Sequence, residues 1–169
     1  MGDSAVTIIA IFLAAILMFV FPLMTMADKS DDVSQLAVQT ATTEFVNKIR
    51  TTGYISQEDY DNFILTLAAT GNSYEPQFAV QKSDQNPAKK SSDDTASIGK
   101  GVEYVLYTTQ VLEQLPLSLN EGDRISVYVE NTNTTVASQL RNFMYRITGK
   151  SSGNIVAQES GIVTKSSAN

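Results

Sequence analysis

The first part of the chain is apolar on every side. Residues Ala5 to Met26 read AVTIIAIFLAAILMFVFPLMTM, with no charged side chain and only two threonines. A helix of about 22 residues, rising about 1.5 Å per residue, is roughly 30 Å long and can cross the hydrocarbon core of a bilayer. We therefore expect residues 1–27 to form a hydrophobic helix that spans a membrane.

Two other interpretations of this segment fit the sequence less well. A cleavable signal peptide has a basic start and an apolar stretch of about 7–15 residues, but here no Lys or Arg precedes a longer run. A core helix of a water-soluble domain normally keeps one polar face.

Pro22 lacks an N–H and crowds the turn before it, which predicts a bend near Met18 to Pro22.

The segment that follows keeps a helical period but has only one apolar face. Val38, Ala41, Phe45 and Ile49 recur at spacings of three or four residues, which is typical of an amphipathic helix. Gly53 suits the left-handed position that often ends a helix. We expect residues 28–52 to continue the first helix, so that one long, bent helix reaches about Arg50. A melted joint at Asp28 to Ser34 is an alternative.

The rest of the chain predicts a small domain of mixed structure, residues 53–169. A second helix is expected after Ser56, whose hydroxyl can cap it, and Gly71 lies beyond its end. Strand-like segments rich in β-branched and aromatic residues follow. They are residues 74–81, where Pro76 weakens the start, and residues 102–107, 125–129 and 155–164, with Gly161 as a bulge.

Three further features complete this domain. The polar stretch near 82–100 has no periodicity and predicts a flexible hairpin loop. A short helical turn is expected from Thr108 to Leu115. Val136, Leu140, Phe143 and Ile147 repeat at four, three and four residues, which predicts an amphipathic helix. The fold class is therefore α+β: a long hydrophobic helix leading into a small antiparallel sheet with helices packed on one face.

Composition removes most catalytic and binding chemistries. The chain has no Cys, His or Trp, so thiol nucleophiles, disulfides and imidazole ligands or bases are excluded. From Asp28 onward, 12 Lys and Arg face 17 of the 18 acids, which argues against nucleic-acid binding. Glu58, Asp59 and Asp61 share the start of the second helix, where carboxylates suit the dipole. We expect no enzyme activity, no metal and no cofactor.

The charges beside the apolar segment leave its orientation open. No Lys or Arg precedes it, and Asp28, Lys29, Asp31 and Asp32 follow it, so the positive-inside rule favours neither direction. Asp3 has two interpretations. It can be a helix-start carboxylate that faces water, or it can pair with the N-terminal amine of a neighbouring copy in an apolar assembly.

The sequence resembles a type IV pilin-like subunit, most closely the Tad-type (TadE-like) group of Gram-positive bacteria. The resemblance comes from the uncharged apolar helix with Pro22 in it, the amphipathic continuation to about Arg50 and the small α+β head. The stretches TTEFVNKIRTTGYISQEDYDNFILTLAATGNSY, ENTNTT and NFMYRITG also look similar to sequences of such systems. Pilins of this family usually have Glu at the fifth mature position, whereas this chain has Ala5, and Asp3 is the nearest carboxylate.

The resemblance implies a structural subunit held in the cell membrane by a single pass, with an extracytoplasmic head, that later enters a cell-surface filament. Its implied partners are membrane lipid, other copies of the chain, a prepilin peptidase and pilus assembly machinery. Alanines in the apolar helix permit close approach of helices. The expected assembly interface comprises Met1, Asp3, Ala5, Ile8, Phe12, Ala15, Phe19 and Pro22. The alternative is a static membrane-anchored accessory or binding protein of such an apparatus.

Overall fold

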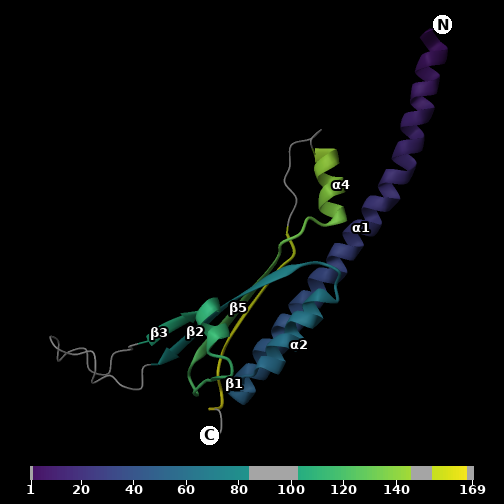
Figure 1. The fold of residues 1–169 in the computed structure, drawn as a ribbon. Helices are drawn as coiled ribbons and strands as arrows, with labels where there is room; N and C mark the ends of the chain where they lie inside the picture. The colour runs from purple at the N-terminus through teal and green to yellow at the C-terminus, as the bar shows by residue number, and fades with distance from the viewer. Residues whose placement is uncertain (1, 84–102, 146–153, 167–169) are drawn as a thin grey trace, which may run out of the picture.

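The molecule consists of one very long helix with a small head packed along its second half (Figure 1). The computed structural model describes residues 2–83, 103–145 and 154–166. Its elements are α1 (Gly2–Thr52), β1 (Tyr54–Ile55), α2 (Gln57–Ala68), β2 (Tyr74–Ser83), β3 (Glu103–Tyr107), α3 (Thr108–Glu113), β4 (Leu117–Ser118), β5 (Arg124–Asn131), α4 (Val136–Tyr145) and β6 (Val156–Ile162). This arrangement confirms the α+β class.

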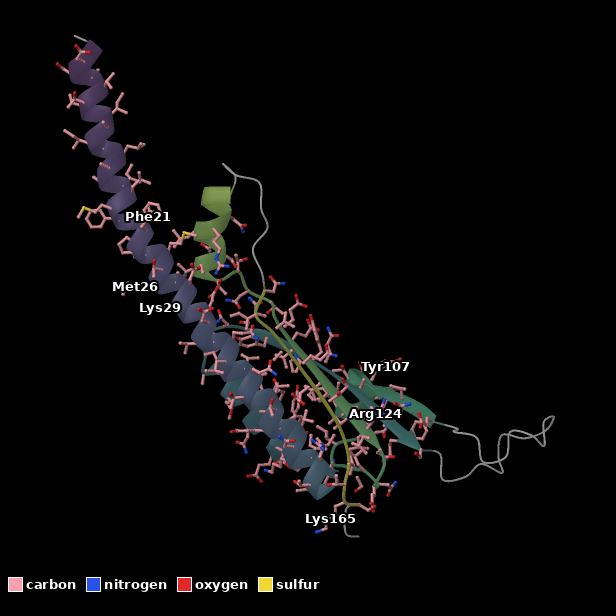
Figure 2. All side chains as sticks on the ribbon, turned by 180° about the vertical axis from the view of Figure 1, so that it is seen from behind. Phe21, Met26, Lys29, Tyr107, Arg124 and Lys165 are labelled. Carbon is pink, nitrogen blue, oxygen red and sulfur yellow. The ribbon has the colours of Figure 1, made fainter. Side chains whose placement is uncertain are left out.

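Helix α1 is continuous from the apolar segment into the head. Its 51 residues correspond to about 75 Å of helix. Of the two possibilities for Asp28 to Ser34, the melted joint is wrong, because this stretch is helical throughout. Side chains of the head bond to Asp28 and Asp31 in this stretch, and these contacts stabilise the helix there. Pro22 lies inside the helix without ending it, and the change of direction near Phe21 is visible in Figure 2.

The head contains a four-stranded antiparallel sheet in the order β3-β2-β5-β6. Strand β5 is central and pairs with β2 through Tyr74↔Asn131 to Gln81↔Arg124. Pro76 is tolerated because β3 pairs with β2 only from Ala79 onward, so the proline lies where β2 has no neighbour on its β3 side. The two-residue strands β1 and β4 form a separate antiparallel pair, which the sequence pattern did not reveal.

The core lies between the sheet and the pair of helices α1 and α2. Alternate residues of β5, Ile125, Val127 and Val129, are fully buried, as expected for a strand with one face on a core. On α1 the predicted stripe is confirmed, because Val38, Ala41, Phe45 and Ile49 are all buried. The Phe45 ring stacks on Phe63 of α2 with centroids 4.4 Å apart.

The helix and turn signals of the head were largely correct. The Ser56 hydroxyl accepts the Asp59 backbone N–H and caps α2. Gly53, Gly71 and Gly122 all have positive φ, the backbone region that favours glycine. The expected helical turn after Thr108 is α3. The loop expected near 82–100 lies almost wholly outside the described residues, while Lys82 and Ser83 belong to β2.

Two expectations about the head were wrong. Gly161 forms no bulge, because β6 pairs with β5 in unbroken register, with Ile125 opposite Gly161. Helix α4 was expected on one face of the sheet, but it lies beside α1 instead (Figure 1). Val136, the first residue of its predicted apolar stripe, is 66% exposed. Leu140 is partly buried, while the side chain at position 143 and all of position 147 lie outside what the structure describes.

Candidate assembly and membrane-facing surface

The first half of α1 presents apolar side chains to its surroundings on every side. No residue from Asp3 to Val33 is buried, and side chains around the helix such as Phe12, Met18 and Phe19 are about two-thirds or more exposed. Among the described residues this is the one helix long and apolar enough to cross a membrane. An apolar surface of this size is not stable in water, so lipid or protein must cover it.

Polar side chains within this segment are satisfied by the helix itself. The Thr7 hydroxyl donates to the Asp3 carbonyl at 2.7 Å, and the Thr25 hydroxyl donates to the Phe21 carbonyl at 3.0 Å. In hydrocarbon, an unpaired polar group costs several kcal/mol. Because both hydroxyls bond back to their own helix, neither needs water or a partner chain.

Six of the eight expected assembly residues fall on one stripe of this exposed helix. Their spacing alternates between three and four residues, the period at which two packed helices meet. These six are Ala5, Ile8, Phe12, Ala15, Phe19 and Pro22, and all of them are exposed. Asp3 is also exposed, in the first turn of α1, and Met1 lies outside the described residues. The head covers none of the described seven.

A group of ionic and polar contacts follows directly after the apolar segment. The Arg141 guanidinium of α4 donates to the Asp28 carboxylate, with nitrogen–oxygen distances of 3.0 Å and 2.7 Å. The Thr135 hydroxyl donates to the Asp31 carboxylate at 2.8 Å. We call Asp28, Asp31, Thr135 and Arg141 the boundary cluster. It ties the start of α4 to α1 at the level where the apolar side chains end.

One turn further along α1, the head is held by a side chain that imitates a strand. The Gln35 amide nitrogen donates to the Val156 carbonyl at 2.6 Å, and its oxygen accepts the Val156 N–H at 3.0 Å. Gln35 therefore satisfies both backbone groups of the first residue of β6. Sequence reasoning missed this contact and the boundary cluster, because the partners are more than a hundred residues apart and no local pattern marks them.

Of the three acids that begin α2, Asp59 has a definite partner. The Lys48 ammonium of α1 donates to its carboxylate. Partial burial raises the pKa of Asp59, but hydrogen bonds from Lys48 and Ser56 and the Lys48 charge outweigh burial and hold that pKa below its usual range. The same hydrogen bond and charge raise the pKa of Lys48. The pair links α1 to α2, which is a structural role.

The described residues show no cluster of three or more acidic side chains able to hold a metal ion. The most conspicuous surface in the described ranges is instead the bare apolar half of α1, followed by the boundary cluster. Comparison of the chain with protein-family models, with curated proteins and with solved structures found no match.

Proposed function

We propose that this chain is a structural subunit of a type IV pilin-like filament of the Tad type, assembled through the first half of α1. The observation that supports it is the division of one unbroken helix. Residues from Asp3 to Val33 are never buried, whereas the second half supplies five buried apolar residues to the head's core. A rigid helix with a head at one end and a bare apolar rod at the other suits a bundle of rods with heads outside.

Copies of the chain provide the environment that the rod needs after it leaves lipid. The stripe from Ala5 to Pro22 contains both bulky and small side chains, since Ala5 and Ala15 occur among Ile8, Phe12 and Phe19. Small residues let helix backbones approach closely, and bulky neighbours then pack around them. In this proposal Asp3 pairs with the N-terminal amine of an adjacent copy, because a charge in an apolar bundle needs a partner.

In this proposal the chain meets its partners one after another. Membrane lipid covers the rod first, and other copies cover it in the filament at the cell surface, with the head extracytoplasmic throughout. A prepilin peptidase and pilus assembly machinery would act between these stages. Nucleic acid is not a partner in this proposal, and the chain acts as a structural element without catalysis or cofactor.

Because the chain has no cysteine, a single introduced thiol tests the assembly. We expect Phe12→Cys to be protected from a water-soluble maleimide in sheared surface fibres, because the rod is covered there by other copies. Leu65→Cys is the matched control and should be labelled, since Leu65 on α2 is 67% exposed and Phe12 is 69% exposed in the single chain. Fibres that lack the chain, or in which Phe12→Cys is labelled as readily as Leu65→Cys, would overturn the proposal.

The boundary cluster favours a second candidate, a static membrane-anchored accessory protein of a secretion or pilus apparatus. Its charged contacts lie directly after the span, as suits a head that stays beside the bilayer. Replacing residues 5–26 with an unrelated apolar span separates the two candidates. Filament assembly depends on the shape of the rod and should be lost, whereas an accessory protein needs only its anchor and should keep its activity.

A further inference from the structure

The exposed stripe of the apolar segment continues past the end of that segment. Its residues from Ala5 to Pro22 are three and four positions apart in turn, and the same spacing continues through Met26, Lys29, Val33, Leu36 and Thr40. All five of these side chains are exposed. We call the whole set, from Ala5 to Thr40, the long stripe. It covers 35 residues, which is five heptads.

Beyond the boundary cluster, the long stripe lies on the side of α1 that faces away from the head. Val33 is 69% exposed and Leu36 is 68% exposed, whereas Val38 is fully buried. At 3.6 residues per turn, Val33 and Val38 are about 140° apart around the helix. The sheet, α2 and α4 pack on other sides of α1 (Figure 1). The stripe ends where the next heptad position, Thr43, donates its hydroxyl to the Glu159 carboxylate at 3.3 Å.

Lipid does not reach Val33 and Leu36 when the apolar segment spans a bilayer. Along the helix, Val33 lies about 10 Å past Met26, and Leu36 lies about 15 Å past it. The polar layer on each side of the hydrocarbon core is only about 5–8 Å thick. Between Met26 and Val33, α1 also carries four charged residues, Asp28, Lys29, Asp31 and Asp32. The two apolar side chains therefore lie beyond the lipid, and a protein surface must cover them if they are to leave water.

We propose that the long stripe is the surface through which two copies of this chain pair in the membrane, as a parallel, in-register coiled coil that continues past the bilayer to Thr40. Apolar residues that recur at three and four positions over several heptads are the pattern by which one helix packs on another. A strict seven-residue period keeps one face in the seam along its whole length, because the two helices coil around each other. The inference rests on insertion of α1 in a bilayer and is independent of filament assembly.

The membrane fixes the direction and the register of such a pair. Copies of a single-pass protein insert in one direction, so their helices are parallel. They also lie at one depth, since charged residues follow the apolar segment from Asp28 onward in every copy. Val33 of one copy is then level with Val33 of the other, as in the contact of a twofold pair. Lys29 is the one charged residue on the long stripe, and a single polar residue in a seam specifies register at a cost in stability.

The part of the long stripe outside the hydrocarbon core is too short to hold two chains together by itself. From Met26 to Thr40 it extends about 21 Å, and one face of such a helix offers less than the roughly 1,000 Å² that a stable interface buries. The spans supply the remainder. They confine both copies to one bilayer in one direction, which raises the effective concentration of the outer part. The full chain in lipid is therefore the form that should pair.

Single cysteines in the full chain, reconstituted in phosphatidylcholine vesicles, test the pairing, because the chain has no cysteine of its own. A disulfide needs two Cα atoms within about 7 Å, so it reports the same residue of two copies face to face. We expect Val33→Cys to give several-fold more disulfide-linked dimer on mild oxidation than Leu65→Cys, an apolar position on α2 that is 67% exposed. This excess should persist as the protein-to-lipid ratio is lowered, whereas dimers from random collisions decrease.

A second substitution tests whether the seam continues outside the bilayer. Leu36→Asp in the Val33→Cys chain should lower the dimer yield several-fold, because it places two carboxylates opposite each other in the seam. Since Leu36 is exposed in the single chain, the fold should be kept. Leu65→Asp in the Val33→Cys chain is the matched control and should leave the yield unchanged.

Three results would overturn the inference. Val33→Cys that dimerises no more than Leu65→Cys would show that these faces do not meet. A yield that Leu36→Asp leaves unchanged would show that only the spans pair. Quenching of a fluorophore on Val33→Cys by brominated acyl chains would show that lipid covers this face. Labelling of Phe12→Cys in fibres would overturn filament assembly and leave these vesicle results unchanged, so the two proposals fail separately.

Discussion

At the scale of single residues, Arg50 and Gly161 show how the end of α1 is attached to the head. The Arg50 side chain passes directly over Gly161, and its Nε donates to the Ile162 carbonyl at 3.1 Å. A Cβ on Gly161 would lie 2.1 Å from Cδ of Arg50. The backbone carbonyl of Arg50 also accepts the Thr164 N–H at 2.9 Å. This glycine therefore makes room for a side chain.

We expect Gly161→Ala to destabilise the fold, because the Arg50 side chain must move and give up its bond to Ile162. The loss of one such hydrogen bond is about 0.5–1.5 kcal/mol. Thermal unfolding followed by circular dichroism in detergent would measure it. In an Arg50→Ala background the three atoms nearest to the added methyl are gone, so the cost of Gly161→Ala should largely disappear. An equal cost in both backgrounds would contradict this explanation.

The Lys48–Asp59 pair makes stability depend on pH at both ends of the scale. Folding lowers the pKa of the Asp59 carboxyl group. The stability that this carboxylate contributes is therefore complete above the pKa it has in the unfolded chain, and it is lost as pH falls through the pKa it has in the folded chain. Folding raises the pKa of the Lys48 ammonium group, so the stability that it contributes is lost only as pH rises through its pKa in the folded chain. Lys48 is more than half exposed, which keeps the contribution small.

We therefore expect Asp59→Asn to lower stability by a constant, small amount between about pH 5 and pH 9. The difference from the unmodified chain should shrink below and above that range, as the pair loses one charge. Denaturant unfolding at a series of pH values would measure it. Asp61→Asn is the control, because Asp61 is an exposed acid near the start of the same helix that accepts a hydrogen bond from the neutral Gln57 side chain. A difference that does not change with pH would exclude the ion pair as its cause.

Local sequence patterns gave correct predictions at positions whose role depends on residues nearby in the chain. Ser56 was expected to cap α2 because a hydroxyl three residues before an acid has that local role, and the structure confirms it. Gly161 was expected to mark a bulge, since a lone glycine in a strand often does. A glycine is needed at this position because the Arg50 side chain, from the end of α1, lies against it. No sequence pattern near residue 161 indicates this contact.

At the scale of elements, α1 serves both as a rod and as one wall of the head. Its buried stripe was predictable because apolar residues at spacings of three and four already specify a covered face. The stripe of α4 was equally clear, yet its neighbour was not predictable. Periodicity shows that a face is apolar, but not whether the sheet, another helix or lipid covers it. The partner depends on contacts such as Arg141 with Asp28, which are distant in sequence.

Gln35 should contribute more to the α1–head attachment than its polar character suggests. Gln35→Ala would leave both the N–H and the carbonyl of Val156 without their partner. We expect a loss of about 1–3 kcal/mol, because two hydrogen bonds to partly buried backbone groups are lost, at about 0.5–1.5 kcal/mol each. Gln158→Ala, at an exposed position of β6, removes the same side chain and should be nearly neutral. Equal unfolding midpoints for the two variants would contradict the role given to Gln35.

At the scale of the whole molecule, the α+β class was predictable because helical and strand periods occupy separate parts of the sequence. The strand order β3-β2-β5-β6 was not, since pairing depends on contacts that no single strand encodes. Nor could the sequence show that Ser34 is the first buried residue of α1, or that the head already contacts the helix at Asp28 and Asp31. The eight-residue assembly interface stays a prediction, because it concerns a partner surface.

The domain boundary can be tested by removing parts of α1. A chain lacking residues 1–26 should fold as a soluble head, because it keeps every residue that is buried in the described parts of the chain. A chain lacking residues 1–52 should not fold. It loses the five buried apolar residues of α1, Val38, Ala41, Phe45, Val46 and Ile49.

A fully buried Val, Ile or Phe contributes about 1.5–3 kcal/mol, and a whole domain has only about 5–15 kcal/mol. Circular dichroism and amide proton dispersion in nuclear magnetic resonance spectra would compare the two chains. Cooperative unfolding of the shorter one would show that the head is independent of α1.

The side-by-side packing of the head on α1 has a mechanical consequence. The sheet lies along the second half of the helix (Figure 1), and contacts from Gln35 to Arg50 are distributed over about four turns. A pull between head and membrane acts parallel to this interface, so these contacts share the load as in shear and do not open one after another. Resistance to such a pull depends on the rate of forced unfolding. In the proposed filament, this geometry would help each subunit to hold its head against flow or traction.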